Sequence, residues 1–402
     1  MTVNKKEPLC WVPYYSIEIG TNGELHPCCK IKGTGPYTAE SEIDDFYSDT
    51  ANEWRRQNFE NSDTLPEVCN ACKVPENTFS YRGLNKTIWL EKFKWDAPQQ
   101  PTLKKIIIAM DNVCSSSCVM CGPHASSTIA NFLNKNVITF FDSRPEHKMS
   151  NLTKKPVHQG TTLELLDHHK ATLEVLHIYG GEPLISPNLE KAVEVAINAP
   201  NFKFMSFSTG LQNIKESHVE LLSKYRSQLR IKANISLDGP LDLNHWSRGI
   251  PADEFTKNFK LVKDNMQIIG FQSTIGIYNV FALPELVEVV KKLWTGMTTR
   301  VPILMSGPIQ SPIELSPNQL PDDIKEQVIH KLTMYLESGK CPSYATELIQ
   351  TGIDYCKRPS TLPWAVCREY VHIFPALRGN EATIEQWFEK YLSADAVSGQ
   401  TL

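Results

Sequence analysis

The sequence lacks the features that would place a protein in a membrane or on nucleic acid. No run of about 18 apolar residues occurs, and the first ten residues contain no apolar stretch of signal-peptide length. A strong excess of one charge is also lacking, because the formal net charge is -4, so no long-range attraction to nucleic acid or to an anionic surface is expected. We therefore expect a cytoplasmic protein without nucleic-acid or membrane partners.

Internal repeats and low-complexity tails are absent as well, and hydrophobic residues make up 41% of the 402 positions. This is enough for a sizeable core, so stability does not depend on small-protein staples. The chain nevertheless contains 11 cysteines. Cytoplasmic thiols stay reduced, and many of these cysteines are tightly clustered, which indicates metal or iron–sulfur ligation and not a disulfide framework.

From about residue 103 the sequence alternates between short apolar runs and amphipathic helical segments. Each run is typical of a parallel strand that is buried on both faces. We expect an α/β fold, a partial (β/α)6 TIM-like barrel, with a Cys-rich N-terminal domain over 1–98, the barrel over 99–306 and a helical C-terminal extension over 307–402. The expected strands are 106–110, 173–179, 202–208, 231–237, 273–280 and 301–305.

A compact cysteine motif follows the first of these strands. Cys114, Cys118 and Cys121 are spaced Cys-x-x-x-Cys-x-x-Cys within one short loop. Three thiolates on such a loop can bind three irons of a cubane and leave the fourth iron open to an exogenous ligand. The alternative is a zinc site, which usually needs a fourth Cys or His, and His124 lies close enough in sequence to supply it.

This loop resembles that of the radical S-adenosylmethionine (SAM) superfamily, and a second motif extends the resemblance. Gly180-Gly181-Glu182-Pro183 resembles the Gly-Gly-Glu-Pro motif that holds the amino group of SAM's methionine. The glycines allow a ligand to approach the backbone closely, and a carboxylate suits an ammonium group. Met120 departs from the family, which often has an aromatic residue there near the adenine.

Further matches fall at the ends of later strands. Ser208 and Thr209 end the third strand, and Ser236 and Asp238 end the fourth in a segment that resembles the one facing SAM's ribose. Arg248 resembles the arginine that pairs with SAM's carboxylate, for which a guanidinium is the suitable partner. Active sites of parallel βα barrels lie at these strand ends. Ordinary strand-end capping is the alternative for Ser236, Asp238 and Arg248.

A second cysteine group lies in the N-terminal segment. The spacing of Cys10, Cys28, Cys69 and Cys72 resembles the twitch or SPASM auxiliary-cluster domains, which follow the barrel in most relatives but precede it here. Four thiolates would fully ligate a [4Fe–4S] cluster suited to electron transfer or to structural stapling. Cys29 could replace Cys28, and four cysteines could instead bind a structural zinc ion.

Three more cysteines, Cys341, Cys356 and Cys367, lie in the C-terminal segment at wide and irregular intervals. They are typical of core or surface thiols. The alternative is that one of them donates a hydrogen atom to a substrate radical, or that they assist a second cluster.

The resemblance implies a radical SAM enzyme. A reduced [4Fe–4S] cluster would cleave SAM to methionine and a 5′-deoxyadenosyl radical, which abstracts hydrogen from a peptide or small-metabolite substrate. The implied cofactors are this cluster, SAM and an auxiliary [4Fe–4S] cluster, and the implied partner is an electron donor such as flavodoxin or ferredoxin. An auxiliary cluster favours a net oxidation or bond formation. The competing hypothesis is a non-catalytic, zinc-stapled scaffold or binding protein.

Overall fold

The computed structural model describes residues 7–21, 23–28, 31, 35–38, 40–60, 64–67, 69, 86, 88–142, 161–297 and 303–393. The chain forms two compact units. The first unit comprises Met1–Asn112, Val157–Phe207 and Leu221–Ile231, and the second comprises Val113–Pro156, Ser208–Glu220 and Lys232–Leu402. The boundaries of these units differ from the expected segments 1–98, 99–306 and 307–402, and that three-part division stays a prediction. Within the described part of the chain, no helix is both long and apolar enough to cross a bilayer.

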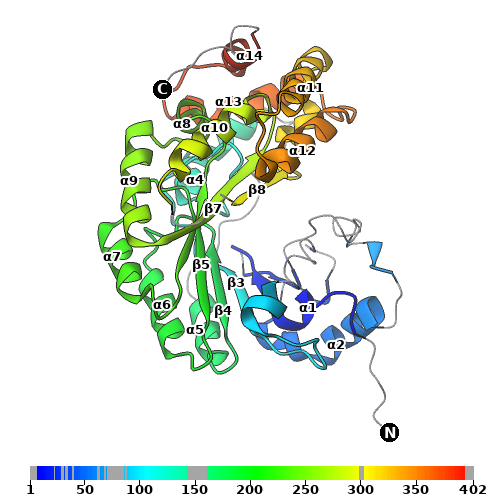
Figure 1. Ribbon diagram of the computed structural model, residues 1–402, viewed down its shortest axis with the longest axis vertical. Coiled ribbons are helices and arrows are strands. Elements are labelled where there is room, and N and C mark those ends of the chain that lie inside the picture. Colours follow the sequence, from blue (N-terminus) through cyan, green and yellow to red (C-terminus); the bar gives the residue numbers. More distant parts are fainter. Residues whose placement is uncertain are drawn as a thin grey trace. The chain divides into compact units, whose positions relative to one another are not determined.

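The first unit is built on a sheet in which strands run in the order β2-β1-β3-β4-β5. The β1–β3, β3–β4 and β4–β5 pairs are parallel, and β2 pairs with β1 antiparallel. Figure 1 shows β3, β4 and β5 side by side. Strand β1 belongs to the N-terminal segment and was not anticipated from the sequence. The bounds are β1 (Ser16–Ile19), β2 (Leu25–His26), β3 (Lys105–Ala109), β4 (Val175–Tyr179) and β5 (Phe204–Thr209).

Both faces of this sheet are largely buried, as the apolar runs predicted, but they differ in polarity. Ile17, Ile108 and Phe207 point to one face and are fully buried. The other face carries polar groups, since the register places Glu18 of β1 level with His177 of β4. Neighbouring residues on a strand point to opposite faces, so a single polar residue within an apolar run is enough to make one face polar.

The first unit also contains a core rich in aromatic residues. Tyr15 packs against the rings of Trp89 and Trp95 at centroid distances of 5.9 and 5.1 Å, and Trp89 lies 5.0 Å from Trp95. The helices of this unit are α1 (Val12–Tyr15), α2 (Asp49–Arg55), α5 (Thr161–His168) and α6 (Leu189–Asn198), with helical turns at Ile43–Tyr47, Arg56–Glu60 and Trp89–Phe93. Helix α7 (Glu216–Tyr225) is divided between the two units.

In the second unit the strands run in the order β6-β7-β8, and both neighbouring pairs are parallel. Strand β7 begins and ends earlier than the expected run 273–280. The backbone turns after Ile275 because the Asn279 carboxamide accepts a hydrogen bond from Gly276 N at 2.8 Å, so the buried residues Ile277 and Tyr278 belong to a loop. The bounds are β6 (Lys232–Ser236), β7 (Gln267–Ile275) and β8 (Ile303–Pro308).

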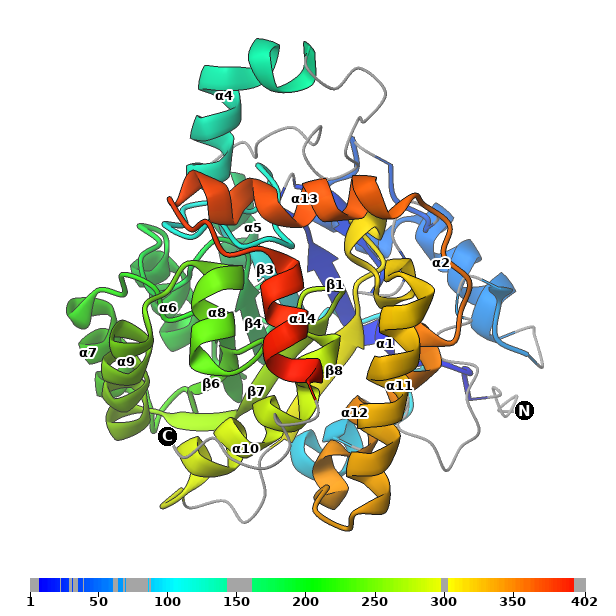
Figure 2. The same cartoon turned by 90° about the horizontal axis from the view of Figure 1, so that it is seen from above.

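The C-terminal part of the second unit is helical, as expected, and Figure 2 shows α11 and α12 packed side by side. The helices are α4 (Ser127–Asp142), α8 (Leu241–Arg248), α9 (Ala252–Asn265), α10 (Leu283–Trp294), α11 (Asp322–Glu337), α12 (Thr346–Cys356), α13 (Trp364–Leu377) and α14 (Ile384–Leu392). Short 3-10 turns lie at Val280–Ala282, Ile313–Leu315, Pro317–Gln319 and Ser343–Ala345. The predicted α/β class, with parallel strands alternating with helices as in a partial (β/α) barrel, is confirmed.

Candidate functional site

The cysteine loop lies between β3 and α4 and is held by hydroxyl groups at the start of α4. Ser126 accepts a hydrogen bond from Ile129 N at 3.3 Å, as an N-cap does, and donates one to the Ser116 carbonyl at 2.6 Å. Thr128 Oγ1 donates to the Cys114 carbonyl at 2.8 Å. The loop therefore takes its shape from side chains that follow it directly in the sequence.

The last turn of α8 provides the second support of the loop. The final carbonyls of a helix have no partner within the helix. Here Ser247 O accepts from Val119 N at 2.9 Å, and Arg248 O lies 3.7 Å from Cys118 Sγ. Gly249, whose φ of 86° closes the helix, offers its carbonyl to Gln212 Nε2 at 3.2 Å. The helix end is thereby a docking surface for the cysteine loop.

Two residues that sequence reasoning missed complete this arrangement. Gln212 also accepts a hydrogen bond from the Ser116 hydroxyl, so it connects the cysteine loop to α8. Arg378 donates to the carbonyls of Ser117 and Trp246, and to Ser117 Oγ at 3.0 Å. Burial lowers the pKa of Arg378 to about 10. No local motif surrounds Arg378, so the sequence carried no signal for its role.

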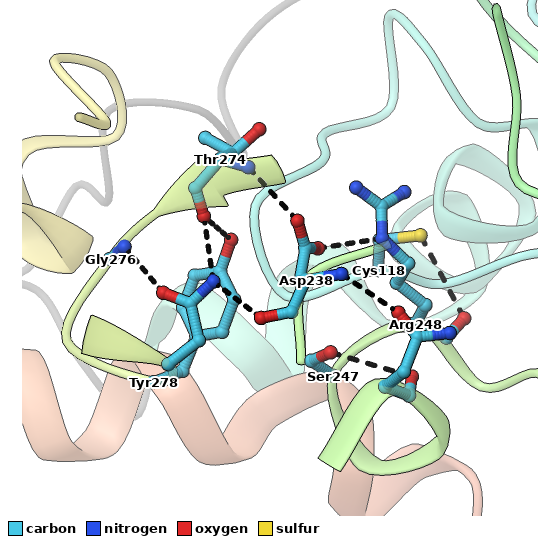
Figure 3. A network of polar contacts seen from close by, with 9 residues as sticks. Cys118, Asp238, Ser247, Arg248, Thr274, Gly276 and Tyr278 are labelled. Atoms are coloured by element: carbon cyan, nitrogen blue, oxygen red, sulfur yellow. Dashed lines mark hydrogen bonds and ion pairs between the residues drawn. The ribbon is translucent and has the colours of Figure 1, made fainter. Parts of the chain in front are cut away.

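Asp238 and Arg248, which the sequence analysis singled out separately, form an ion pair. Arg248 Nε donates to Asp238 Oδ2 at 2.6 Å, and Thr274 N donates to Oδ1 at 3.0 Å. Figure 3 shows the terminal nitrogens of Arg248 pointing away from Asp238. Burial acts against the charge of Arg248, but Asp238 and Cys118 raise its pKa above the ordinary value. Asp238 is fully buried and is held in place by Thr274 N. Its carboxylate therefore orients the guanidinium of Arg248.

The electrostatics of the loop favour a thiolate at Cys118 but a neutral thiol at Cys121, whose pKa is raised well above its ordinary value by the hydrogen bond with Cys118 and by burial. A hydrogen bond from the Cys121 thiol and the charges of Arg248 and Arg378 lower the pKa of Cys118 to about 6, against the effect of burial. The thiolate is the form of cysteine that binds a metal, so Cys118 fits the role of a ligand to an iron–sulfur cluster. Across the described residues, no three His, Cys, Asp or Glu side chains are arranged to hold a single metal ion.

Ser208, Thr209 and Ser236 lie at strand ends of β5 and β6, whereas Met120 lies within the cysteine loop. Ser208 Oγ is 3.4 Å from Gln272 Oε1, and the buried Thr209 accepts a hydrogen bond from Leu211 N at 2.9 Å. Ser236 and Met120 are half-buried. The contacts of these residues with ribose and adenine stay predictions.

In the first unit, the turn after β4 has the backbone that its glycines predict. Gly180 and Gly181 have φ values of 77° and 54°, and a Cβ atom on Gly180 would lie 2.6 Å from that of Ala109. Glu182 is 3% exposed and accepts a hydrogen bond from Leu184 N at 3.2 Å; Pro183 follows it in the turn. The turn is therefore a tight backbone cradle at the end of a strand.

The buried carboxylate of Asp111 anchors this turn. Asp111 follows β3 and accepts hydrogen bonds from Ser186 Oγ and from Asn188 Nδ2, the latter at 2.9 Å. Asp111 thus stabilises the glycine turn, although in sequence it lies next to the cysteine motif.

The N-terminal cysteines lie in the aromatic core of the first unit. Cys10, Cys28 and Cys69 are 7–9% exposed and belong to one buried cluster with Trp11, Trp89 and Trp95. Cys29 and Cys72 lie outside the described residues, so the expected set of four ligands stays a prediction.

Of the C-terminal cysteines, Cys356 and Cys367 are buried core thiols and Cys341 is half-buried. Burial raises the pKa of Cys356 and of Cys367 to about 12, and it also raises the pKa of Cys341. Thiols with raised pKa values carry little thiolate and are correspondingly unreactive as nucleophiles or metal ligands.

Comparison with known proteins gives weak structural likenesses. No protein-family model and no curated protein matches the sequence. Native anSMEcpe with bound AdoMet is 15% identical, with a TM-score of 0.36 over 58% of this chain and 62% of that chain. Streptococcus suis SuiB bound to S-adenosylmethionine is 14% identical, with a TM-score of 0.39 over 65% of this chain and 55% of that chain. SuiB bound to the precursor peptide SuiA is also 14% identical, with a TM-score of 0.39 over 65% of this chain and 51% of the SuiB chain.

The chain thus spans about three fifths of the length of the first of these structures. Likenesses at such TM-scores do not identify a family. The residues of the site are therefore the basis for assigning a function.

Proposed function

We propose that this chain is a radical SAM enzyme. The observation that carries the proposal is the docking of the cysteine loop on the last turn of α8, the helix that ends with Arg248. Cys118 and Arg248 are 130 residues apart in sequence, yet Cys118 Sγ lies 3.7 Å from the Arg248 carbonyl. Three cysteines on one loop and an oriented guanidinium within the same unit are the groups that a cluster and the carboxylate of SAM require.

Each residue has a defined part in this proposal. Cys114, Cys118 and Cys121 would ligate a [4Fe–4S] cluster, and Arg248, held by Asp238, would direct its terminal nitrogens to the carboxylate of SAM. When bound and reduced, the cluster supplies the electron that breaks the C5′–S bond of SAM, giving methionine and a 5′-deoxyadenosyl radical.

The resemblance assigns further contacts with SAM to the turn after β4 in the first unit and to strand ends of the second unit. The backbone of Gly180 and Gly181 would allow close approach, and the Glu182 carboxylate would accept hydrogen bonds from the amino group. Ser236 would face the ribose, Ser208 and Thr209 would add polar contacts with SAM from the preceding strand end, and Met120 would take the place near the adenine, as the resemblance implies.

The N-terminal cysteines would hold an auxiliary cluster. Cys10, Cys28 and Cys69 share one buried core, and Cys72 would be the fourth ligand. A fully ligated cluster can accept an electron from a substrate radical, so we propose a net oxidation or bond formation on a peptide or small metabolite, with flavodoxin or ferredoxin as electron donor.

Anaerobic reconstitution with iron and sulfide tests this function. We expect a brown protein that, once reduced, converts SAM to 5′-deoxyadenosine, and we expect Cys114→Ala to abolish the conversion. The matched control is Cys341→Ala, which removes a half-buried thiol outside both cysteine groups and should leave iron content and cleavage unchanged. A colourless, zinc-loaded protein without cleavage under strict anaerobiosis would instead support the scaffold hypothesis.

A further inference from the structure

One face of the sheet in the first unit carries polar groups that the proposed function does not use. The register of the parallel strands places Glu18 of β1, His177 of β4 and Ser206 of β5 at one level. Tyr179 points to the same side as His177, because residues two apart on a strand share a face. These side chains come from three strands, so the folded sheet brings them together.

Glu18 has unfilled hydrogen-bonding capacity on this face. Its side chain is 3% exposed, and Tyr179 Oη reaches across the small side chain of Ala109 to donate to Glu18 Oε1 at 2.8 Å. The second carboxylate oxygen, Oε2, is buried and has no partner among the described residues. Ser16 Oγ on the same face of β1 is also buried and unpartnered within the described structure.

Buried carboxylate oxygens without a donor are rare in proteins, because their desolvation is costly. An oxygen atom of this kind beside a second unpartnered hydroxyl indicates a position for a ligand that donates hydrogen bonds.

The surroundings of Glu18 favour a cationic ligand. His177 Nδ1 lies 2.7 Å from Ser206 Oγ, and burial with the nearby Lys105 lowers the pKa of His177 to about 4, so the imidazole is neutral at physiological pH. Lys105 lies toward the start of β3, and its ammonium is 5.7 Å from the centroid of the Trp89 ring. His26, the antiparallel neighbour of Glu18, has an acidic partner of its own, Glu24, at 3.8 Å.

We propose that Glu18 and Tyr179 form a recognition site for a primary ammonium group of the substrate, with Glu18 Oε2 as its acceptor. Tyr179 holds the carboxylate by its other oxygen and so keeps Oε2 directed at the ligand. Tyr179 is followed directly by Gly180, and Thr21 Cγ2 lies 3.1 Å from the position of a Cβ atom on Gly180, so the site adjoins the glycine turn. That the ligand is a substrate rests on the proposed function. That the site binds an ammonium group does not depend on that function.

Titration calorimetry on the reconstituted full chain tests the site with Nα-acetyl-L-lysine methylamide as the cationic probe. Its Nε-acetylated counterpart is the neutral control. We expect saturable binding of the cationic probe and none of the neutral one. Glu18→Gln keeps the acceptor for Tyr179 but places an amide near the ligand, and should weaken binding about tenfold.

The matched control variant is Glu24→Gln, which removes the same charge from a side chain that is 50% exposed and should leave binding unchanged. Tyr179→Phe should weaken binding about threefold through the loss of one hydrogen bond, and it provides a second test if Glu18→Gln does not fold. Equal affinity for both probes, no saturable binding, or wild-type affinity in the Glu18 and Tyr179 variants would overturn the site.

SAM cleavage by the unmodified protein separates this inference from the proposed function. Cleavage without probe binding overturns the ammonium site and leaves the radical SAM proposal intact. Probe binding that depends on Glu18, in a protein that does not cleave SAM, supports the site and contradicts the proposed function.

Discussion

The two cysteine groups of this chain differ in environment: one is surrounded by polar contacts and the other by aromatic rings. The loop of Cys114, Cys118 and Cys121 is held by hydrogen bonds to the last turn of α8 and lies near two arginines. Cys10, Cys28 and Cys69 instead pack in an aromatic core, where centroid distances between the rings are as short as 5.0 Å.

This contrast separates two ways of holding a thiol. Polar docking fixes the direction of a loop, and the nearby positive charges favour the thiolate. Apolar packing fixes position and excludes water, which suits a staple or an electron-transfer centre and not a site that must admit a ligand. The following predictions test whether the two groups differ in function as they differ in environment.

The largest expected effect comes from removing one cysteine of each group. Cys118→Ala should eliminate 5′-deoxyadenosine formation, because the central triad would lose a ligand. Cys10→Ala should lower the iron content from about eight to about four atoms per chain and reduce cleavage without eliminating it. Iron analysis and product chromatography on the two variants check this. Complete loss of cleavage in Cys10→Ala would show that the groups do not act separately.

The support of the central loop by Arg378 should have the next largest effect. Arg378→Ala leaves the carbonyls of Ser117 and Trp246 without this donor, which should lower the free energy of unfolding by about 3 kcal/mol. It should also reduce iron loading of the central site, because the loop loses its connection to α8. Denaturant unfolding and iron analysis measure the two effects.

The control for Arg378 lies on α13, the helix that Arg378 follows directly. Arg368 forms an ion pair with Glu385 at 2.6 Å, but its side chain is 51% exposed. Exposed pairs contribute little, so Arg368→Ala should cost less than about 1 kcal/mol and leave iron loading unchanged. Equal effects of the two substitutions would contradict the assignment of Arg378.

The smallest expected effects come from alanine substitutions at three glycines, whose costs in stability can be compared between the two units. Gly180→Ala should cost about 3 kcal/mol, because φ is 77° and the new Cβ would meet the Ala109 Cβ at 2.6 Å. Gly249→Ala should cost about 2 kcal/mol, since φ is 86° but the nearest atom, Cδ of Arg378 at 2.8 Å, belongs to a flexible side chain.

Gly339 is the control for these positions. Its φ is 70° and nothing lies within 4 Å of an added Cβ, so Gly339→Ala should cost about 1 kcal/mol from backbone strain alone. Thermal denaturation gives the order, and a cost at Gly339 as large as that at Gly180 would show that backbone strain, not contact, sets the effect.

Features that depend on neighbouring residues in the sequence were predicted best. The amphipathic segments expected between the apolar runs include α10, whose buried residues recur at helical spacing. Strand β1 was missed because it has only four residues, one of them the charged Glu18. Strand β7 was misplaced because buried loop residues such as Ile277 are as apolar as strand residues.

The sequence by itself determined the spacing of Cys114, Cys118 and Cys121 and the glycine turn at Gly180-Gly181, since both are properties of short, contiguous segments. Tertiary structure alone decided that Arg378 would reach the cysteine loop and that Tyr179 would reach Glu18, across 261 and 161 residues respectively. Contacts of this kind have no local periodicity or motif, because they arise when separate elements pack and their buried polar groups must find partners.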